Sequence, residues 1–163
     1  MTPLPEPLSF AMRPANMHDL EELTAIDALC FPAGIAYPRG EIAWLLRNPR
    51  ITTVIAELAG AVGGFAACQR KQQQNVRYGE LITIEVLPQF RRQSIGRELY
   101  QVLEKNLRDW GGTRMQLQVS VENAVAVSFY QRLGYRTVSR IPRYYLQTID
   151  AWQMEKVFPG KPA

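Results

Sequence analysis

The chain has 163 residues, of which 47% are hydrophobic and 21% are charged; this fits one folded domain and excludes a disordered chain. No apolar run approaches the roughly 20 residues that span a bilayer, so we expect no membrane partner. The formal net charge is +4 with scattered basic residues, and His18 is the only histidine, so we expect no nucleic-acid partner, no histidine-based triad and no multi-histidine metal site.

Residues 1–9 contain three prolines and neither a basic nor an apolar segment, which predicts a loose lead-in rather than a signal peptide. We take residues 1–163 as a single domain, because the chain shows no repeat and no low-complexity linker. Cys30 and Cys68 lie far apart in the sequence, which is typical of reduced thiols. We therefore expect a cytoplasmic protein, either a monomer or a homodimer.

The first half of the chain predicts two helices followed by three strands. Apolar residues recur at helical spacing over 19–30, and Pro32 follows them. The polar run over 69–77 predicts a turn or loop. The predicted elements, in order, are helices over 19–30 and 41–47 and strands over 51–57, 62–69 and 79–87.

The second half alternates helices with strands. An apolar stripe runs along 94–110, and apolar residues then alternate with polar ones over 114–121. Asn123 is placed to cap a helix over 124–133. Two closing strands, 135–139 and 151–158, complete a mixed sheet in an α+β domain.

The segment Arg-Arg-Gln-Ser-Ile-Gly-Arg over 91–97 joins the strand over 79–87 to the helix over 94–110. A tight turn that opens a helix leaves its first N–H groups without intrahelical partners, and the helix dipole favours an anion there. With three arginines alongside, this turn predicts a pyrophosphate site. The alternative is an exposed basic turn without a ligand.

The stretch over 81–134 resembles the GNAT N-acetyltransferases, whose acetyl-CoA motif is [QR]-x-x-G-x-[GA]; Arg91 fills its first position and Gly96 its last. The resemblance extends to the opening Met-Arg-Pro-Ala over 12–15, to Cys-Phe-Pro over 30–32 and to Tyr-Tyr over 144–145. Together these make the chain similar to the bacterial ribosomal-protein-alanine N-acetyltransferases. The resemblance implies the GNAT acyl-CoA N-acyltransferase fold, with a mixed, mostly antiparallel sheet that is splayed at the cofactor site and flanked by helices.

The resemblance also implies how acetyl-CoA binds. The backbone of Ile84, Glu85 and Val86 would hydrogen-bond the pantetheine arm, and Asn123 would contact the cofactor arm. The residues implied at the pyrophosphate are Arg91, Arg92, Gln93, Ser94, Ile95, Gly96 and Arg97. The simpler reading of Asn123 is a helix cap alone.

Tyr130 is implied as the acid that protonates the departing CoA thiolate, since a phenol has a reference pKa of about 10. Its alternative role is core packing on the stripe of its helix. The acetyl group passes directly to the amine, so neither a nucleophilic residue nor a metal is expected. Tyr144 and Tyr145 are either packing residues or part of a substrate groove.

Two residues depart from the family pattern. Ser94 stands where the motif has its first glycine, and a positive φ there would cost about 1–2 kcal/mol. Gln118 stands where the ribosomal-protein-alanine enzymes carry a glutamate proposed as general base. Glu80 is the best replacement and Glu85 the second; a regular strand places them on opposite faces. Alternatively, Glu80 is a solvated charge.

The missing glutamate favours one class of acceptor. Neutralising an α-amine with a pKa of about 8 at pH 7 costs roughly 1.4 kcal/mol, whereas a lysine near 10.4 costs about 4.6 kcal/mol. The sequence thus predicts an acetyl-CoA-dependent N-acetyltransferase that acts on an N-terminal α-amine, such as that of a ribosomal protein. The alternatives are an acetyltransferase of a small-molecule amine or a lysine, and a catalytically weak acyl-CoA-binding module.

Overall fold

The computed structural model describes residues 2–3 and 9–160, so the expected lead-in over 1–9 falls largely outside the described residues. The strands are β1 (Ala11–Pro14), β2 (Ile51–Leu58), β3 (Ala61–Gln73), β4 (Val76–Val86), β5 (Arg114–Ser120), β6 (Arg136–Tyr145) and β7 (Ile149–Val157). The helices are α1 (Leu20–Cys30), α2 (Arg39–Arg47), α3 (Ile95–Asp109) and α4 (Ala124–Arg132), with 3-10 turns η1 (Met17–Asp19) and η2 (Pro88–Phe90). In this part of the chain no helix is long and apolar enough to cross a membrane.

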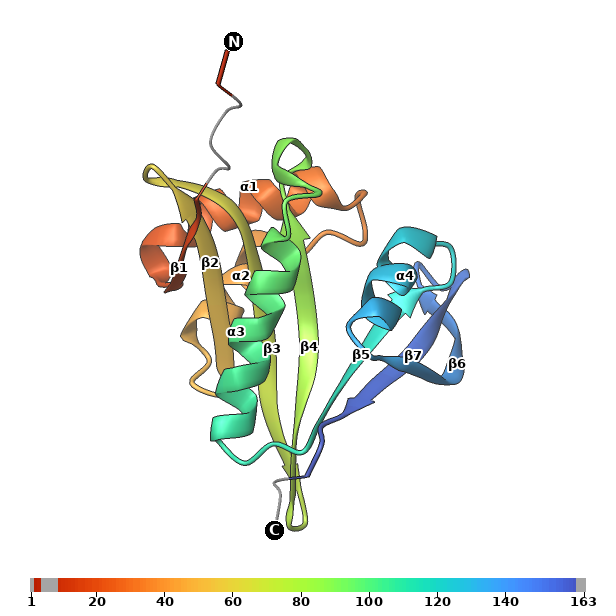
Figure 1. Cartoon of the computed structure of the whole chain (residues 1–163). Coiled ribbons are helices and arrows are strands. Elements are labelled where there is room, and N and C mark those ends of the chain that lie inside the picture. The colour runs from red at the N-terminus through yellow and green to blue at the C-terminus, as the bar shows by residue number, and fades with distance from the viewer. Residues whose placement is uncertain (1, 4–8, 161–163) are drawn as a thin grey trace.

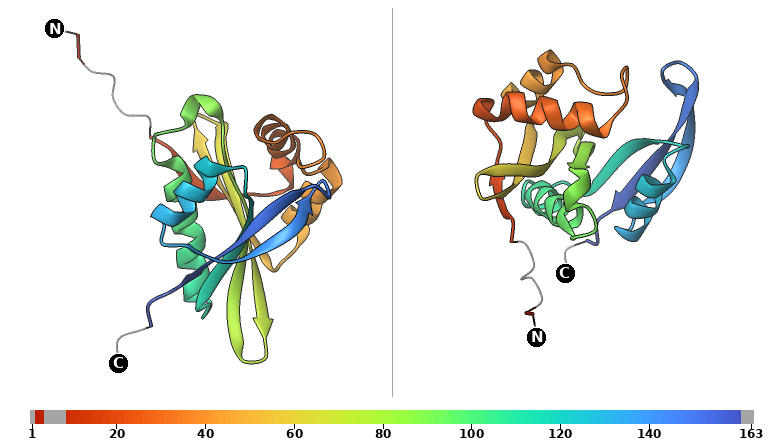
Figure 2. Two further views of the ribbon diagram at one scale, coloured as in Figure 1. Left: turned by 90° about the vertical axis from the view of Figure 1, so that its right-hand side faces the viewer. Right: turned by 90° about the horizontal axis from the view of Figure 1, so that it is seen from above.

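One seven-stranded sheet forms the centre of the fold, in the order β1-β2-β3-β4-β5-β7-β6. β4 and β5 pair in parallel, and the other neighbouring strands are antiparallel. Helices α3 and α4 cover one face of the sheet, and α1 and α2 cover the other (Figures 1 and 2). The predicted mixed sheet with flanking helices is therefore confirmed.

The amphipathic pattern of α3 explains how it packs on the sheet. Leu99, Leu103 and Leu107 are at most 2% exposed and face β3 and β4. Val102, which the sequence pattern placed on the buried stripe, is instead exposed, whereas Tyr100 is buried. The longer Tyr100 ring reaches from the flank of the helix to an edge-on contact with Tyr135, 5.9 Å between centroids.

The expectation of a turn or loop over 69–77 was wrong for most of that segment. β3 continues to Gln73 and β4 begins at Val76, so the two strands form a long hairpin whose turn contains Gln74. The polar side chains suggested a loop. The two strands nevertheless form there, because backbone hydrogen bonds rather than buried apolar side chains hold together the part of the hairpin that extends into solvent. Arg77 also anchors the hairpin by stacking on Trp110, with 4.9 Å between its guanidinium carbon and the ring centroid.

The sheet separates between β4 and β5. Only Gly79 with Met115 and Glu80 with Gln116 are paired across these two strands. Beyond these pairs the strands diverge, and Figure 1 shows the resulting wedge opening toward the end of the sheet where α3 begins. The expected splay is present, and it leaves the β5-facing edge of residues 84–86 without a neighbouring strand.

Candidate functional site

The turn over 91–97 joins β4 to α3 at the open end of the wedge. The N–H of Glu98 donates to the carbonyl oxygen of Ser94 at 3.0 Å, which begins the helical ladder. The N–H groups that precede Glu98 in the first turn of α3 therefore lack intrahelical acceptors. Arg92 and Arg97 are exposed beside them, and neither forms an ion pair within the described residues.

Arg91 has a different position from the other two arginines. Its Nε donates to the carbonyl oxygen of Val86 at 3.0 Å, so its side chain folds back along the end of β4. Its guanidinium also lies 3.8 Å from the Sγ of Cys30. Arg91 thus braces the turn against the strand, while its backbone remains part of the predicted cradle.

Ser94 adopts the left-handed conformation that the motif glycine would supply. Its φ is 64° and its ψ is 10°, and its side chain makes no capping hydrogen bond to α3. A residue with a Cβ is strained in this region by about 1–2 kcal/mol. At Gly96, by contrast, an added Cβ would meet Phe129 at 3.5 Å, an ordinary contact, which agrees with the alanine that the motif allows there.

Helix α4 supplies the predicted cap and the predicted acid. The Oδ1 of Asn123 accepts from the N–H of Ala126 at 3.1 Å, so the expected cap is confirmed. Tyr130 lies half-buried on the α3 side of the sheet, with its ring edge-on to Phe129 and Tyr135. Burial raises the pKa of Tyr130 above its ordinary value, with Tyr145 and Glu85 adding to the effect, so the phenol keeps its proton at neutral pH.

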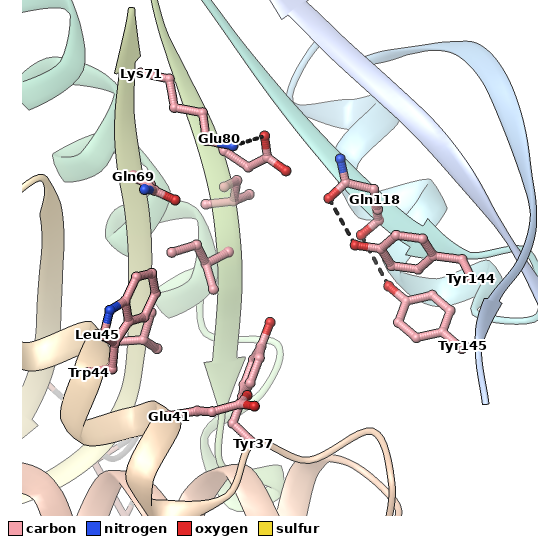
Figure 3. A pocket seen from close by; sticks show the side chains of 12 residues that line it. Tyr37, Glu41, Trp44, Leu45, Gln69, Lys71, Glu80, Gln118, Tyr144 and Tyr145 are labelled. Carbon is pink, nitrogen blue, oxygen red and sulfur yellow. Dashed lines mark hydrogen bonds and ion pairs between the residues drawn. The ribbon is translucent and has the colours of Figure 1, made fainter. Parts of the chain in front are cut away.

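A cavity of about 430 Å³ opens on the α2 side of the wedge (Figure 3). Its lining residues come from α2, β3, β4, β5, β6 and the segment between α1 and α2: Tyr37, Glu41, Trp44, Leu45, Gln69, Lys71, Glu80, Leu81, Ile82, Gln118, Tyr144 and Tyr145. The predicted base Glu80 and both predicted groove tyrosines therefore line one space. No local sequence pattern marks Tyr37 and Lys71, because only the tertiary fold brings them to this cavity.

Glu80 is the carboxylate that reaches into this cavity. Its Oε2 accepts from the Nε2 of Gln116 at 2.8 Å and from the Nζ of Lys71 at 3.3 Å. Both donors contact the same oxygen, so the other carboxylate oxygen retains its accepting capacity. This geometry suits a carboxylate that accepts a proton from an amine, directly or through a water molecule.

Gln118 is held in place by hydrogen bonds on both sides of its amide. Its Nε2 donates to the Oε1 of Gln153 at 2.8 Å, and its Oε1 accepts from the Tyr144 hydroxyl at 3.4 Å. The Tyr145 hydroxyl donates to the backbone oxygen of Gln118 at 3.3 Å. The amide cannot act as a base, but it holds Tyr144 at the cavity wall, while the backbone of Gln118 holds Tyr145 (Figure 3).

Glu80 and Glu85 do not lie on opposite faces of β4, contrary to the expectation from strict alternation. Ala67 pairs with Thr83 and Cys68 with Leu81, so Ile82 is an extra residue in the ladder. A one-residue bulge reverses the alternation beyond it. Glu80 pairs with Gln69 and Glu85 with Phe65, two residues of the same β3 face, so both carboxyl groups lie on the α1 and α2 side.

Glu85 nevertheless does not present a free carboxylate to the cavity. It is 2% exposed, and the Thr83 hydroxyl donates to its Oε2 at 2.8 Å. Burial, with the buried carboxyl of Asp27 adding to it, raises the pKa of Glu85 to about 9. A carboxyl that is protonated at neutral pH cannot accept the proton of an amine, so Glu80 is the better placed of the two candidate bases.

Comparison with known proteins identifies the family of this chain. Residues 18–135 match the model of the acetyltransferase (GNAT) family. A relative from Sulfurisphaera tokodaii named N-alpha-acetyltransferase is 27% identical over 154 residues, which cover 89% of this chain and 91% of that protein. A Saccharolobus solfataricus protein of the same name is 25% identical over 156 residues, covering 90% of this chain and 92% of that one.

Solved structures share the fold. The ribosomal-protein-S18-alanine N-acetyltransferase from Escherichia coli superposes with a TM-score of 0.80 at 22% identity, covering 95% of this chain and 99% of that one. Ard1 from Thermoplasma volcanium gives a TM-score of 0.83 at 21% identity, covering 94% of this chain and 100% of that one. Because the family model spans most of the described chain, the protein belongs to the acetyltransferase (GNAT) family.

Proposed function

We propose that this enzyme transfers an acetyl group from acetyl-CoA to the α-amino terminus of a protein. The observation that carries the proposal is the separation of β4 from β5, beside which lies a cavity that holds Glu80. Full-length relatives named N-alpha-acetyltransferase support the α-amine as acceptor.

The wedge fits acetyl-CoA. The unpaired edge of residues 84–86 would hydrogen-bond the pantetheine arm as an added strand does, and the N–H groups opening α3 would bind the pyrophosphate with help from Arg92 and Arg97. Asn123 caps α4, the helix that lies on the β5 side of the strand separation (Figure 1). Bound acetyl-CoA supplies a thioester carbonyl that is open to attack by an amine.

The cavity suits an α-amine better than a lysine. An α-amine with a pKa of about 8 costs roughly 1.4 kcal/mol to deprotonate at pH 7, against about 4.6 kcal/mol for lysine. Glu80 would take this proton, and the aromatic wall of Tyr37, Tyr144 and Tyr145 would orient the peptide end. Tyr130 would return a proton to the leaving sulfur from the other side of the wedge.

The proposal is tested with acetyl-CoA and a pool of heptapeptides that have free N-termini beginning with Ala, Ser, Thr, Gly or Met. Mass spectrometry should find acetyl groups on α-amines. A matched pool with blocked N-termini and one internal lysine should remain unmodified. Acetylation of the lysine pool alone would overturn the proposed acceptor.

Two residues favour a second function, that of an acyl-CoA-binding module with weak catalysis. Ser94 puts a Cβ in the anion-binding turn, and Gln118 replaces an acidic side chain by an amide. Calorimetry should distinguish the two functions. Binding of acetyl-CoA without turnover of any peptide or small amine would favour the module, and Tyr130-dependent release of free CoA thiol would exclude it.

The finer expectations about the cellular context remain predictions. A cytoplasmic location, a ribosomal protein as acceptor and a monomeric or homodimeric state each follow from the sequence analysis alone. Size-exclusion chromatography with light scattering tests the oligomeric state directly.

A further inference from the structure

Two buried carboxyl groups belong to α1 and β4, elements that pack against each other. Asp27 comes from α1 and is 0% exposed, and Glu85 comes from β4 and is 2% exposed. Burial raises the pKa of both carboxyl groups, and Asp27 adds to the rise at Glu85. No lysine or arginine of the described chain forms an ion pair with either group, which is unusual for buried carboxylates.

The hydrogen bonds of the pair leave one oxygen of each carboxyl unused. The Thr83 hydroxyl donates to the Oε2 of Glu85, and the backbone N–H of Tyr37 donates to the Oδ2 of Asp27. The Oδ1 of Asp27 and the Oε1 of Glu85 are buried without any partner among the described residues. One proton held between the two groups satisfies both orphaned oxygens and removes one of the two charges.

The neighbouring ionisable groups offer no positive charge that would replace this proton. Burial raises the pKa of Cys30 on α1, Tyr37 after α1 and Tyr130 on α4, and Glu85 adds to the effect at each. Glu41 on α2 acts on Tyr37 in the same direction. Arg91 lies beside the Cys30 thiol, and its guanidinium is directed to Val86 and Cys30 rather than to a carboxyl group.

The positions of Asp27 and Glu85 connect the acceptor cavity with the strand that is proposed to bind the cofactor. Tyr37 lines the cavity, and its backbone is fastened to Asp27 across ten residues of chain. Glu85 belongs to the strand whose free edge is proposed to bind the cofactor. We propose that Asp27 and Glu85 act as positioning residues, sharing one proton that ties the segment over 31–38 at the acceptor cavity to the cofactor strand β4.

The proton makes the stability of the protein depend on pH. An unfolded chain has both carboxyls ionised above their ordinary pKa of about 4, while the folded chain keeps one proton up to about pH 9. Folding therefore takes up one proton in this range, and the stabilisation that is complete at low pH is lost as the pH rises. One proton corresponds to about a tenfold change in the unfolding equilibrium constant per pH unit.

The first arm of the test is urea unfolding of wild type and Glu85→Gln between pH 6 and pH 9. The glutamine amide donates permanently to the Asp27 carboxylate, so this variant needs no shared proton. As the pH rises, the folding equilibrium constant of the wild type should fall by about tenfold per pH unit relative to that of Glu85→Gln. Glu122→Gln, which changes an exposed carboxyl, should behave as the wild type does. Equal pH dependence in wild type and Glu85→Gln would overturn the shared proton.

The second arm is hydrogen exchange of the Tyr37 amide, measured at pH 7. Glu85→Gln and Asp27→Asn should retain protection over 31–38, because an amide keeps the link between the groups. Glu85→Ala should lose it while the protection of α3 is unchanged. Full protection of Tyr37 in folded Glu85→Ala would overturn the positioning role; if Glu85→Ala does not fold, Glu85→Val serves in its place.

A kinetic arm rests on the proposed function. With the heptapeptide pool, Glu85→Ala should raise the KM for peptide, and Glu85→Gln should restore it. An unchanged KM in the alanine variant would contradict the positioning role. The exchange and unfolding arms need no substrate, so their outcome is independent of whether the peptides are acetylated.

Discussion

Glu80 and Glu85 project from the same face of β4, although five positions separate them, because a one-residue bulge at Ile82 intervenes. The two carboxyl groups nevertheless have different surroundings. Glu80 reaches the cavity with Lys71 and Gln116 as partners, whereas Glu85 is buried against Asp27. One strand thereby carries a cavity-lining carboxylate, our proposed base, and a buried carboxyl group, our proposed positioning residue.

Replacing Glu80 by glutamine should lower kcat/KM for an α-amine peptide by about 10²-fold or more at pH 7, because a positioned base contributes 10² to 10⁴. The deficit should shrink near pH 9, where an amine with a pKa of about 8 is already neutral. Steady-state kinetics across this pH range checks the prediction. A deficit that is constant with pH would indicate that Glu80 only shapes the cavity.

Replacing Tyr130 by phenylalanine should lower kcat while leaving the fold intact, because the edge-on ring contacts with Phe129 and Tyr135 need no hydroxyl. Loss of a positioned acid costs about 10² to 10⁴ in rate. Tyr135→Phe is the matched control, since the Tyr135 hydroxyl is buried with no hydrogen-bond partner among the residues that the structure describes. The control should retain full activity; equal activity in both variants would remove the acid role of Tyr130.

Replacing Ser94 by glycine should tighten CoA binding and leave the protein at least as stable. The left-handed backbone at Ser94 costs about 1–2 kcal/mol with a Cβ present, and glycine removes this strain at an entropic cost of about 0.5–1 kcal/mol. Calorimetric titration with CoA measures the affinity. Ser94→Ala keeps the Cβ without the hydroxyl, so weaker binding by this variant would instead show that the hydroxyl contacts phosphate.

Replacing Arg92 and Arg97 together by alanine should weaken CoA binding and reduce its dependence on salt. Both side chains are exposed beside the turn and lack ion-pair partners in the described part of the chain, so they remain available for phosphate. Arg47→Ala combined with Arg50→Ala, at two exposed arginines outside this turn, removes the same charge and serves as the control. An equal loss of affinity in the control would point to overall charge rather than a phosphate site.

Much of this architecture could be predicted from local pattern. The alternation of β5, the stripe of α3, the Asn123 cap and the turn over 91–97 each depend on residues close in sequence, and the resemblance to a GNAT enzyme is confirmed. These features reflect strand and helix periods and capping chemistry, which a single chain displays directly.

The remaining features depend on pairing between distant segments. The bulge at Ile82 is fixed by how β4 aligns with Ala67 and Cys68, and no local pattern marks it. The end of the long hairpin, over 69–77, consists mostly of polar residues. A search for alternating apolar residues therefore does not detect these strands. The meeting of Asp27 with Glu85 likewise requires α1 to pack on β4.

The most direct test uses one peptide that carries both a free α-amine and an internal lysine, incubated with the enzyme and acetyl-CoA at pH 7. Fragmentation by tandem mass spectrometry locates the acetyl group on one amine or the other. The account predicts acetylation of the α-amine, abolished by Tyr130→Phe and reduced by Glu80→Gln. Acetylation of the lysine with an untouched α-amine would contradict it.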